Sequence, residues 1–297
     1  MAKILNFGSL NLDYVYTVEH FVRAGETIAS SKRSVFCGGK GLNQSLALAR
    51  AGVETYHAGA IGPEGHSLVN VLKESNVNIE YIIQLDTPTG HAIIQRDPCG
   101  QNCILLFGGA NQSITSDDID KVLSNFSSGD YILLQNEISN VGEIILKAKE
   151  RKMNIIFNPS PINKYIYDLP LDLVDIFIMN EIEASDICNE KCQDKLLAAL
   201  SNRFPRASIV LTLGEKGVEY IDPTLSEALS QGIYKVDVID TTAAGDTFTG
   251  YFIASIIFGK SKAEALNIAS MASAIAVSRP GAAPSIPYLK EVLSTLF

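Results

Sequence analysis

Two glycine-rich segments carry residue types that could bind an anion and accept a proton. The first, Gly38–Gln44, reads GGKGLNQ, and the second, Asp240–Asp246, reads DTTAAGD. Each leads into an apolar run that is compatible with a helix. Small residues at the start of a helix leave its first N–H groups open to negatively charged oxygen atoms. Both segments therefore predict a binding site for a polar or anionic group at a helix N-terminus.

Asp246 follows three residues with almost no side-chain bulk, Ala243, Ala244 and Gly245. At the start of a helix it could simply complement the helix dipole, which contributes about 0.3–1 kcal/mol. It could instead act as a general base that takes a proton from an attacking hydroxyl, while the N–H groups before it bind the target phosphate. These residues alone leave both interpretations open.

Polar residues also follow the predicted strands at their carboxyl ends. They are Gly8, Asn11, Asp13, Gln135, Glu137, Asn158, Asn180, Glu183, Thr212 and Gly214. Each one alone could be a cap or a turn residue. In an open parallel sheet, however, ligands bind beyond the carboxyl ends of the strands. The set as a whole predicts a polar site suited to hydroxyl groups and a metal-bound phosphate.

The elements that would position these residues alternate between apolar strands and helices. The predicted strands are Lys3–Gly8, Tyr131–Leu134, Asn154–Phe157, Ile176–Met179, Ser208–Leu213 and Val218–Ile221, and the predicted helices include Glu64–Ser75, Ser116–Phe126, Gly142–Arg151 and Glu181–Cys188. This alternation predicts an α/β fold with a mostly parallel sheet covered on both faces. We expect residues 1–297 to form a single domain.

Two segments interrupt the alternation, at about residues 14–36 and 89–107. They hold short strand-like runs with Gly and Pro between them and no helical period. We expect strands outside the main sheet, either as surface hairpins or as a small β lid that closes over a site.

Composition excludes several classes of function. The 297 residues contain 24 Lys and Arg against 33 Asp and Glu, a net charge of −9. An acidic chain without a basic run is a poor ligand for nucleic acid or for an anionic membrane. The first residues lack the pattern of a signal peptide, and the five cysteines are typical of reduced thiols. We therefore expect a cytoplasmic protein, and a zinc site at the two C-x-x-x-C pairs is disfavoured.

The motifs together resemble the ribokinase family of carbohydrate kinases, the PfkB-type kinases. The matching segments are GGKGLNQSLALARAG (38–52), DTTAAGDTFTGYF (240–252), GSLNLD (8–13), QNE (135–137), NPSP (158–161), NEIEA (180–184), TLGEKG (212–217) and AVSRPGAAPSIP (276–287). They follow the family's order and spacing over nearly the whole chain. The resemblance implies a ribokinase-like three-layer α/β/α fold with a small β-sheet lid, and ATP-dependent phosphorylation of a sugar's primary hydroxyl.

The resemblance also implies roles for single residues. In the catalytic centre, Asp246 would be the base, beside an anion hole formed at Ala243, Ala244 and Gly245. The residues matching the family's sugar site are Asn11, Asp13, Gly39, Lys40, Asn43, Glu137 and Asp246. Those matching its ATP site are Asn180, Glu183, Thr212, Gly214, Gly217, Gly245 and Ser270.

Two metal ions and a partner are implied in the same way. Glu183 would help to place Mg²⁺ through water. The residues matching a monovalent-cation loop, which in this family prefers K⁺, are Asp240, Thr242, Ala276, Arg279, Gly281 and Ser285. A homodimer through the lid is expected, because exposed strand edges need covering.

D-ribose, giving ribose 5-phosphate, is the expected substrate, and some departures from the family pattern bear on that choice. They are His91 and Phe107-Gly108 in the lid segment, while Ser270 departs near the expected adenine position. The alternatives are a kinase for 2-deoxyribose, another sugar or a nucleoside, and a non-catalytic sugar or nucleoside binder. An intact Asp246 and anion hole argue against the last of these.

Overall fold

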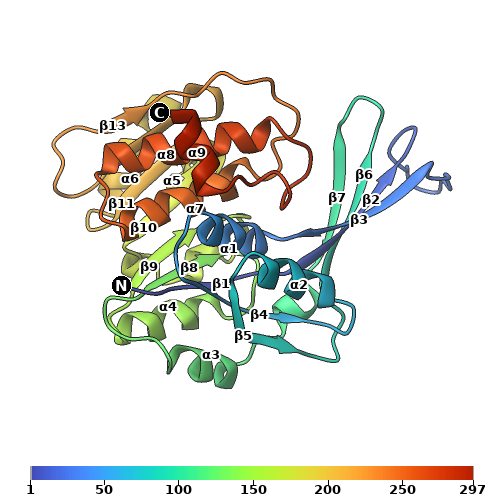
Figure 1. Cartoon of the computed structure of the whole chain (residues 1–297), viewed down its shortest axis with the longest axis horizontal. Coiled ribbons are helices and arrows are strands. Elements are labelled where there is room, and N and C mark those ends of the chain that lie inside the picture. Colours follow the sequence, from blue (N-terminus) through green and yellow to red (C-terminus); the bar gives the residue numbers. More distant parts are fainter. Residues whose placement is uncertain (1, 297) are drawn as a thin grey trace.

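A nine-stranded sheet forms the centre of the protein (Figure 1). The computed structural model describes residues 2–296. The strands of this sheet are β1 (Ile4–Phe7), β4 (Thr55–Ile61), β5 (Asn78–Gln84), β8 (Tyr131–Gln135), β9 (Asn154–Asn158), β10 (Ile176–Asn180), β11 (Ser208–Thr212), β12 (Val218–Ile221) and β13 (Leu229–Gln231). Their order is β13-β12-β11-β10-β9-β8-β1-β4-β5. The strands from β11 to β5 pair in parallel, and β12 and β13 pair antiparallel at one edge.

Helices cover both faces of this sheet and give the predicted three layers. They are α1 (Lys40–Arg50), α2 (His66–Glu74), α3 (Ser116–Leu123), α4 (Val141–Glu150), α5 (Glu181–Cys188), α6 (Leu196–Arg203), α7 (Ala244–Ile257), α8 (Lys262–Val277) and α9 (Leu289–Leu296). One hydrophobic cluster joins the sheet to α1, α7 and α8, and a second joins it to α3, α4, α5 and α6. The mostly parallel α/β architecture predicted from the alternation is confirmed.

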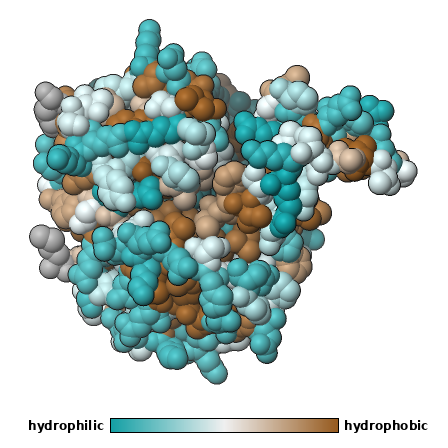
Figure 2. Space-filling view, turned by 45° about the vertical axis from the view of Figure 1, so that its right-hand side comes forward, coloured by the Kyte–Doolittle hydropathy of each residue, from teal (hydrophilic) through white to brown (hydrophobic). Residues whose placement is uncertain are grey.

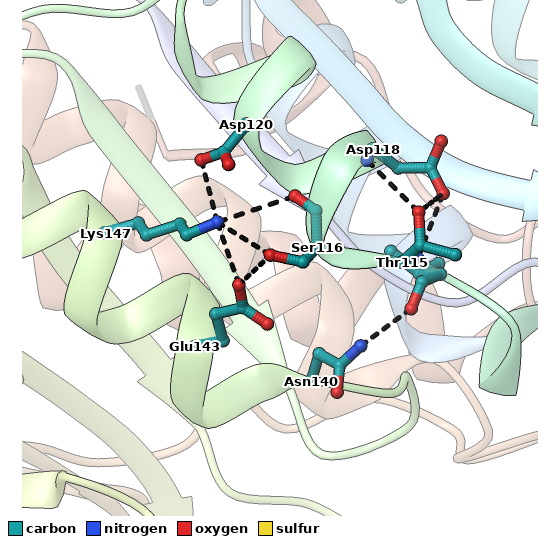
Figure 3. Close-up of polar contacts among 8 residues, drawn as sticks. Thr115, Ser116, Asp118, Asp120, Asn140, Glu143 and Lys147 are labelled. Atoms are coloured by element: carbon teal, nitrogen blue, oxygen red, sulfur yellow. Dashed lines mark hydrogen bonds and ion pairs between the residues drawn. The ribbon is translucent and has the colours of Figure 1, made fainter.

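Neighbouring residues set the start of α3, which lies beside α4 (Figure 3). Thr115 caps α3, and its side chain and that of Asp118 form a reciprocal capping box, which supports the predicted start of this helix. Lys147 of α4 pairs with Asp120 of α3 at 2.7 Å, which joins the two helices, and with Glu143 of its own helix at 2.8 Å. Such exposed ion pairs contribute little energy, so the buried apolar side chains hold the two helices together.

A second, four-stranded sheet projects from the body of the molecule (Figure 1). Its strands are β2 (Asn11–Thr17), β3 (Lys32–Gly38), β6 (Gly90–Arg96) and β7 (Asn102–Phe107), in the order β3-β2-β6-β7. The two central strands pair in parallel and the outer pairs are antiparallel. The prediction of strands outside the main sheet is confirmed. The first strand begins at Asn11, three residues before the predicted segment. We call these strands the small sheet.

None of the helices within residues 2–296 combines the length and the apolar character that crossing a bilayer requires.

Candidate active site

The N-terminus of α7 is open, as the small residues before Asp246 predict. Ala244 and Gly245 are the first two residues of the helix. The N–H of Ala244 donates to the carbonyl oxygen of Thr241 at 3.2 Å, whereas the N–H groups of Gly245 and Asp246 meet no acceptor within residues 2–296. A Cβ on Gly245 would meet no atom within 4 Å. Two free donors and open space are what an incoming anionic oxygen requires.

The carboxylate of Asp246 lies in the first turn of α7 and is only 7% exposed. Asn43 donates to its Oδ2 at 3.0 Å, and Gln44 donates to its Oδ1 at 2.9 Å. Burial raises the pKa of Asp246, and the charge of Lys40 and these two hydrogen bonds oppose that rise. The residue therefore combines a raised proton affinity with a fixed orientation, which suits a general base.

A pocket beside Asp246 gathers residues from distant parts of the chain. Its lining consists of Lys40, Asn158, Ile178, Met179, Asn180, Glu183, Thr212, Thr242, Gly245, Asp246 and Thr249. The structure thus brings together seven residues that the sequence analysis assigned to the catalytic, sugar, nucleotide and cation sites.

Lys40 is the cation of this pocket and lies among three carboxylates. Burial alone would lower its pKa, but Asp246, Glu137 and Glu183 raise it above the ordinary value, so Lys40 stays charged. An ammonium group surrounded by carboxylates beside an open helix N-terminus can compensate the charge of a bound phosphate.

Asn180 and Glu183 form the capping box of α5. The side chain of Asn180 accepts from the N–H groups of Ile182 and Glu183, and the Oε2 of Glu183 accepts from the N–H of Asn180 at 3.0 Å. This leaves one carboxylate oxygen of Glu183 for other contacts. No group of three or more His, Cys, Asp or Glu side chains suited to a metal lies within residues 2–296. A divalent ion here would take most of its ligands from phosphates and water, which fits the habit of Mg²⁺.

Glu137, after β8, anchors the start of α1. Its Oε2 accepts from the N–H of Lys40 at 3.1 Å and from the hydroxyl of Ser9. Burial raises the pKa of Glu137, and the charge of Lys40 opposes the rise. Asp13 lies near it on β2, where burial and then the charge of Glu137 raise the pKa of Asp13 to about 7. The sugar-side carboxylates of the prediction therefore lie together.

The glycine loop packs tightly against the end of β1. Gly39, the N-cap of α1, has a φ of +97°, a conformation that favours glycine. A Cβ on Gly41 would lie 2.3 Å from the backbone N of Ser9 and 2.5 Å from the carbonyl carbon of Gly8. Only a glycine fits at Gly41, which lets α1 approach the chain that leads into the small sheet.

Asn11 is held by Asn111, whose Nδ2 donates to the Oδ1 of Asn11 at 2.8 Å. His91 pairs with Leu12 on one side and Phe107 on the other. Because side chains alternate along a strand, His91 and Phe107 occupy the face opposite to that of Asn11 and Asp13. Their rings pack on each other at 5.0 Å between centroids. These two departures from the family pattern therefore lie away from the sugar-side carboxylates.

Asp240 links the two segments of the predicted cation loop, residues 240–242 and 276–285. Its Oδ1 accepts from the N–H of Thr242 at 3.0 Å, and its Oδ2 accepts from the N–H of Gly281 at 3.0 Å. Burial would raise the pKa of Asp240, but the hydroxyl of Thr242, which also donates to Oδ1, and then these two N–H groups lower it, so the carboxylate is ionised. The guanidinium of Arg279 pairs with Glu291, which leaves only its carbonyl for a cation. Ala276 accepts from the N–H of Arg279 at 3.1 Å, and the N–H of Ser285 donates to Ala282 at 3.1 Å.

Three predicted nucleotide residues lie outside the pocket lining. Gly214 and Gly217 bound a short turn after β11, both with positive φ. Ser270 lies half-buried on α8, one turn before Ser273, whose hydroxyl donates to the carbonyl oxygen of Ala244 at 3.0 Å.

Sequence reasoning assigned no role in the site to Gln44, although the structure places it against Asp246. The one signal was its place in the glycine-rich segment, next to Asn43. Ser9 was missed as well, because nothing in its local sequence links it to Glu137.

Comparison with known proteins shows which family the chain resembles over its length. The model of the pfkB family of carbohydrate kinases matches residues 1–289. A ribokinase from Staphylococcus aureus is 33% identical over 302 residues, covering 98% of this chain and 98% of that protein. Arabidopsis thaliana ribokinase, solved with ribose and ATP, has a TM-score of 0.89 at 30% identity, covering 100% of this chain and 99% of that one. Ribokinase from Cryptococcus neoformans var. grubii, solved with ADP, has a TM-score of 0.86 at 32% identity, with 99% of each chain covered.

Proposed function

The chain belongs to the pfkB family of carbohydrate kinases, and we propose that it transfers the terminal phosphoryl group of ATP to the primary hydroxyl of D-ribose. The observation that carries this proposal is the buried Asp246 beside the open N-terminus of α7. The choice of ribose follows the names of its relatives, among them the ribokinase from Staphylococcus aureus.

In the proposed reaction, Asp246 accepts the proton of the sugar hydroxyl. The hydroxyl oxygen then forms a bond to the γ-phosphorus, and the bond from that phosphorus to the β,γ-bridging oxygen breaks, which releases ADP. The N–H groups of Gly245 and Asp246, which meet no acceptor within residues 2–296, would donate to the transferring phosphoryl group. Ala243 and Ala244 would leave space for it, although the N–H of Ala244, expected as a donor, is engaged with the carbonyl oxygen of Thr241. Lys40 would compensate the charge that develops there.

Sugar hydroxyls would bind between α1 and the small sheet. The proposed contacts are Asn11, Asp13, Gly39, Lys40, Asn43 and Glu137. Asn43 is 5% exposed and its Nδ2 donates to Asp246, so this residue lies directly beside the proposed base.

The nucleotide would lie on the other side of Asp246. The proposed contacts are Asn180, Glu183, Thr212, Gly214, Gly217, Gly245 and Ser270. Mg²⁺ would neutralise charge on the phosphates, with Glu183 holding it through water. A monovalent cation, K⁺ by preference, would bind near Asp240, Thr242, Ala276, Arg279, Gly281 and Ser285, mostly at backbone carbonyls, and steady the N-terminus of α7. Replacing K⁺ with a large organic cation should then slow turnover.

A second copy of the chain would cover the small sheet. Its two faces expose a group of large apolar side chains, and Figure 2 shows hydrophobic residues on this projecting part of the molecule. They are Val35, Phe36, Ile93, Ile104, Leu105, Leu106 and Phe107, each 38–67% exposed. Apolar surface of this kind marks an interaction site in a protein. The five cysteines are free thiols, as is usual in the reducing cytoplasm, where we propose that the protein acts.

ADP release tests the function, measured with Mg²⁺-ATP and K⁺ against ribose, 2-deoxyribose, fructose, 2-keto-3-deoxygluconate and adenosine. Ribose should be turned over well above the others. Asp246→Asn should keep the fold and lower kcat by about 100-fold or more, because the proton acceptor is lost. Preference for another compound would keep the mechanism and change the substrate. No turnover of any of them by folded wild type would contradict the proposal.

A further inference from the structure

Gln44 is a fully buried polar neighbour of Asp246. It lies on α1 with 0% of its surface exposed, so it touches no substrate. Its Nε2 donates to the Oδ1 of Asp246 at 2.9 Å and to the Oδ1 of Asn158 at 3.1 Å. Its Oε1 accepts from the Nε2 of Gln135 at 2.7 Å. Both N–H bonds of the amide and its oxygen are therefore engaged.

Two backbone carbonyls, which can only accept, fix the direction of these amides. On one side, the Nδ2 of Asn158 donates to the carbonyl of Ile178 at 2.9 Å, so its Oδ1 faces Gln44 as an acceptor. On the other side, the Nδ2 of Asn6 donates to the carbonyl of Gly41 at 2.7 Å. The Oδ1 of Asn6 then accepts from Gln135 at 2.9 Å.

Both ends of this chain require the same orientation of Gln44. If its amide were rotated by half a turn, its oxygen would face the Oδ1 of Asp246 and the Oδ1 of Asn158, and its nitrogen would face the nitrogen of Gln135. Each of these contacts would be repulsive or unsatisfied in a buried site. Asp246 therefore meets an N–H donor at this oxygen, and such a donor favours the ionised carboxylate.

We propose that Gln44 is a positioning residue of the phosphoryl transfer, which holds the Asp246 carboxylate in one orientation and keeps it ionised through the amide chain Gln44–Gln135–Asn6. This inference rests on the proposed role of Asp246 as the base. Asn43, which donates to the other oxygen of Asp246, differs because it is partly exposed and its Oδ1 meets no hydrogen-bond partner within residues 2–296.

The other charged groups that face Asp246 come from separate elements. They are Lys40 of α1, Glu183 of α5 and Glu137 after β8. A change confined to Gln44 leaves all three in place, so a shift in the titration of Asp246 can be assigned to the lost hydrogen bond.

The first test compares Gln44→Met and Gln44→Glu with wild type across pH. Gln44→Met removes the donor at nearly constant volume.

This variant should lower kcat about 10–100-fold with little change in the KM for the sugar or the KM for ATP. The acid limb of the kcat profile should move up by about one pH unit, the effect of one charge-assisted hydrogen bond. Gln44→Glu keeps the acceptor for Gln135 and the shape of the side chain. Gln44→Glu should move the acid limb of the kcat profile to still higher pH than Gln44→Met does, because its carboxyl group and that of Asp246 would share a proton.

Thr55→Val is the matched control. Thr55 is 1% exposed, and its hydroxyl donates to the carbonyl of Val53 at 2.9 Å, in β4 and away from Asp246. It should lose stability without moving the acid limb. A wild-type kcat and acid limb in both Gln44 variants would overturn the proposal, as would an equal shift in Thr55→Val.

Thermal unfolding followed from pH 4 to pH 9 gives a second test that needs no turnover. Gln44→Met should lower the unfolding midpoint more toward alkaline pH, where a larger fraction of Asp246 is ionised, and Asp246→Asn should abolish this dependence on pH. An equal loss across the whole range would overturn the proposal. If wild type turned over no sugar while the loss depended on pH, the proposed function would fail and the positioning of Asp246 would stand.

Discussion

The two regions that enclose the proposed sugar site are built in opposite ways. Around Asp246, the buried amides of Asn43 and Gln44 hold both carboxylate oxygens. Gln44 is fixed in turn by further amides, and the last of these donate to backbone carbonyls. On the small sheet, Asp13 meets no hydrogen-bond donor among the described residues, and the strands around it expose apolar side chains on both faces. Both regions contain a carboxylate with a raised pKa, Asp246 in one and Asp13 in the other. Of these two, only Asp246 is held by hydrogen bonds from other residues of the described chain.

This difference matches two proposed tasks: the region around Asp246 would carry out the phosphoryl transfer, and the small sheet would close over the sugar. A base must hold its orientation while a hydroxyl and a phosphate arrive, so its support is permanent. A lid must exchange water for a ligand, and its own polar groups are satisfied only when that ligand is present. We infer that the catalytic centre is complete in the single chain, whereas the small sheet gains partners from the sugar and from a second copy.

The largest expected effect comes from two matched glycines, one in each region. Gly41→Ala should destabilise the fold by about 4–5 kcal/mol, because its Cβ would meet the backbone of Gly8 and Ser9. Gly100→Ala, at a φ of +80° with no atom within 4 Å of its Cβ, should cost about 1 kcal/mol. Urea unfolding measures both. Equal losses would mean that the glycine loop is no more rigid than the small sheet.

Asp13 should make stability depend on pH. Its pKa in the folded protein is about 7, above the ordinary 3.8, so between these values the folded state binds more protons than the unfolded one. Stability contributed by this group therefore falls as pH rises from about 4 to 7. Asp13→Asn should remove the fall and raise the free energy of unfolding at pH 8 by up to about 4 kcal/mol.

Asp240→Asn is the control of opposite sign. The pKa of Asp240 is lowered in the folded protein, so its contribution is present above the ordinary pKa and lost in acid. The variant should therefore lose stability near neutral pH. Chemical denaturation at pH 4 and pH 8 compares the two variants, and a stability gain in both would contradict the assignment.

Introducing a charged side chain on the small sheet should dissociate the proposed dimer. Leu105 and Ile104 are 67% and 60% exposed and point to opposite faces of β7. We expect one of the two variants Leu105→Glu and Ile104→Glu, the one on the face that the second copy covers, to give single chains in light scattering. The reason is that burying an unpaired charge in the interface is costly. The sugar KM should rise about tenfold, equivalent to 1.4 kcal/mol. A wild type that is already a single chain would exclude the dimer.

The smallest expected effect is on sugar affinity. If ionised Asp13 accepts a sugar hydroxyl, its pKa of about 7 makes the ionised fraction fall about threefold between pH 7.5 and 6.5. The sugar KM should rise by the same factor, and Asp13→Asn should show a higher KM that does not vary over this range. A wild-type KM that is constant with pH would remove Asp13 from sugar binding.

The sequence predicted six strands of the main sheet and missed β4, β5 and β13. β5 reads NIEYIIQ, so its residues favour a strand, and the sequence analysis overlooked it. The other two form strands only in context. β4 contains Ala58, Gly59 and Ala60, which have little preference for strands, and its conformation follows from pairing with β1 and β5. β13 is a three-residue edge strand. Helix ends were predicted better, because caps such as Asn180 with Glu183 act within a few residues.

The sequence by itself determined the parts that depend on neighbouring residues. Small residues set the open start of α7, glycine set the start of α1, and capping residues placed Asn180 and Glu183. Only the tertiary structure decided which of these parts meet. Gln44 and Asp246 are 202 positions apart, and Lys40 lies among three carboxylates from separate elements. Local spacing fixes a helix end, but contacts over such separations depend on α1 packing beside α7 on the same face of the sheet.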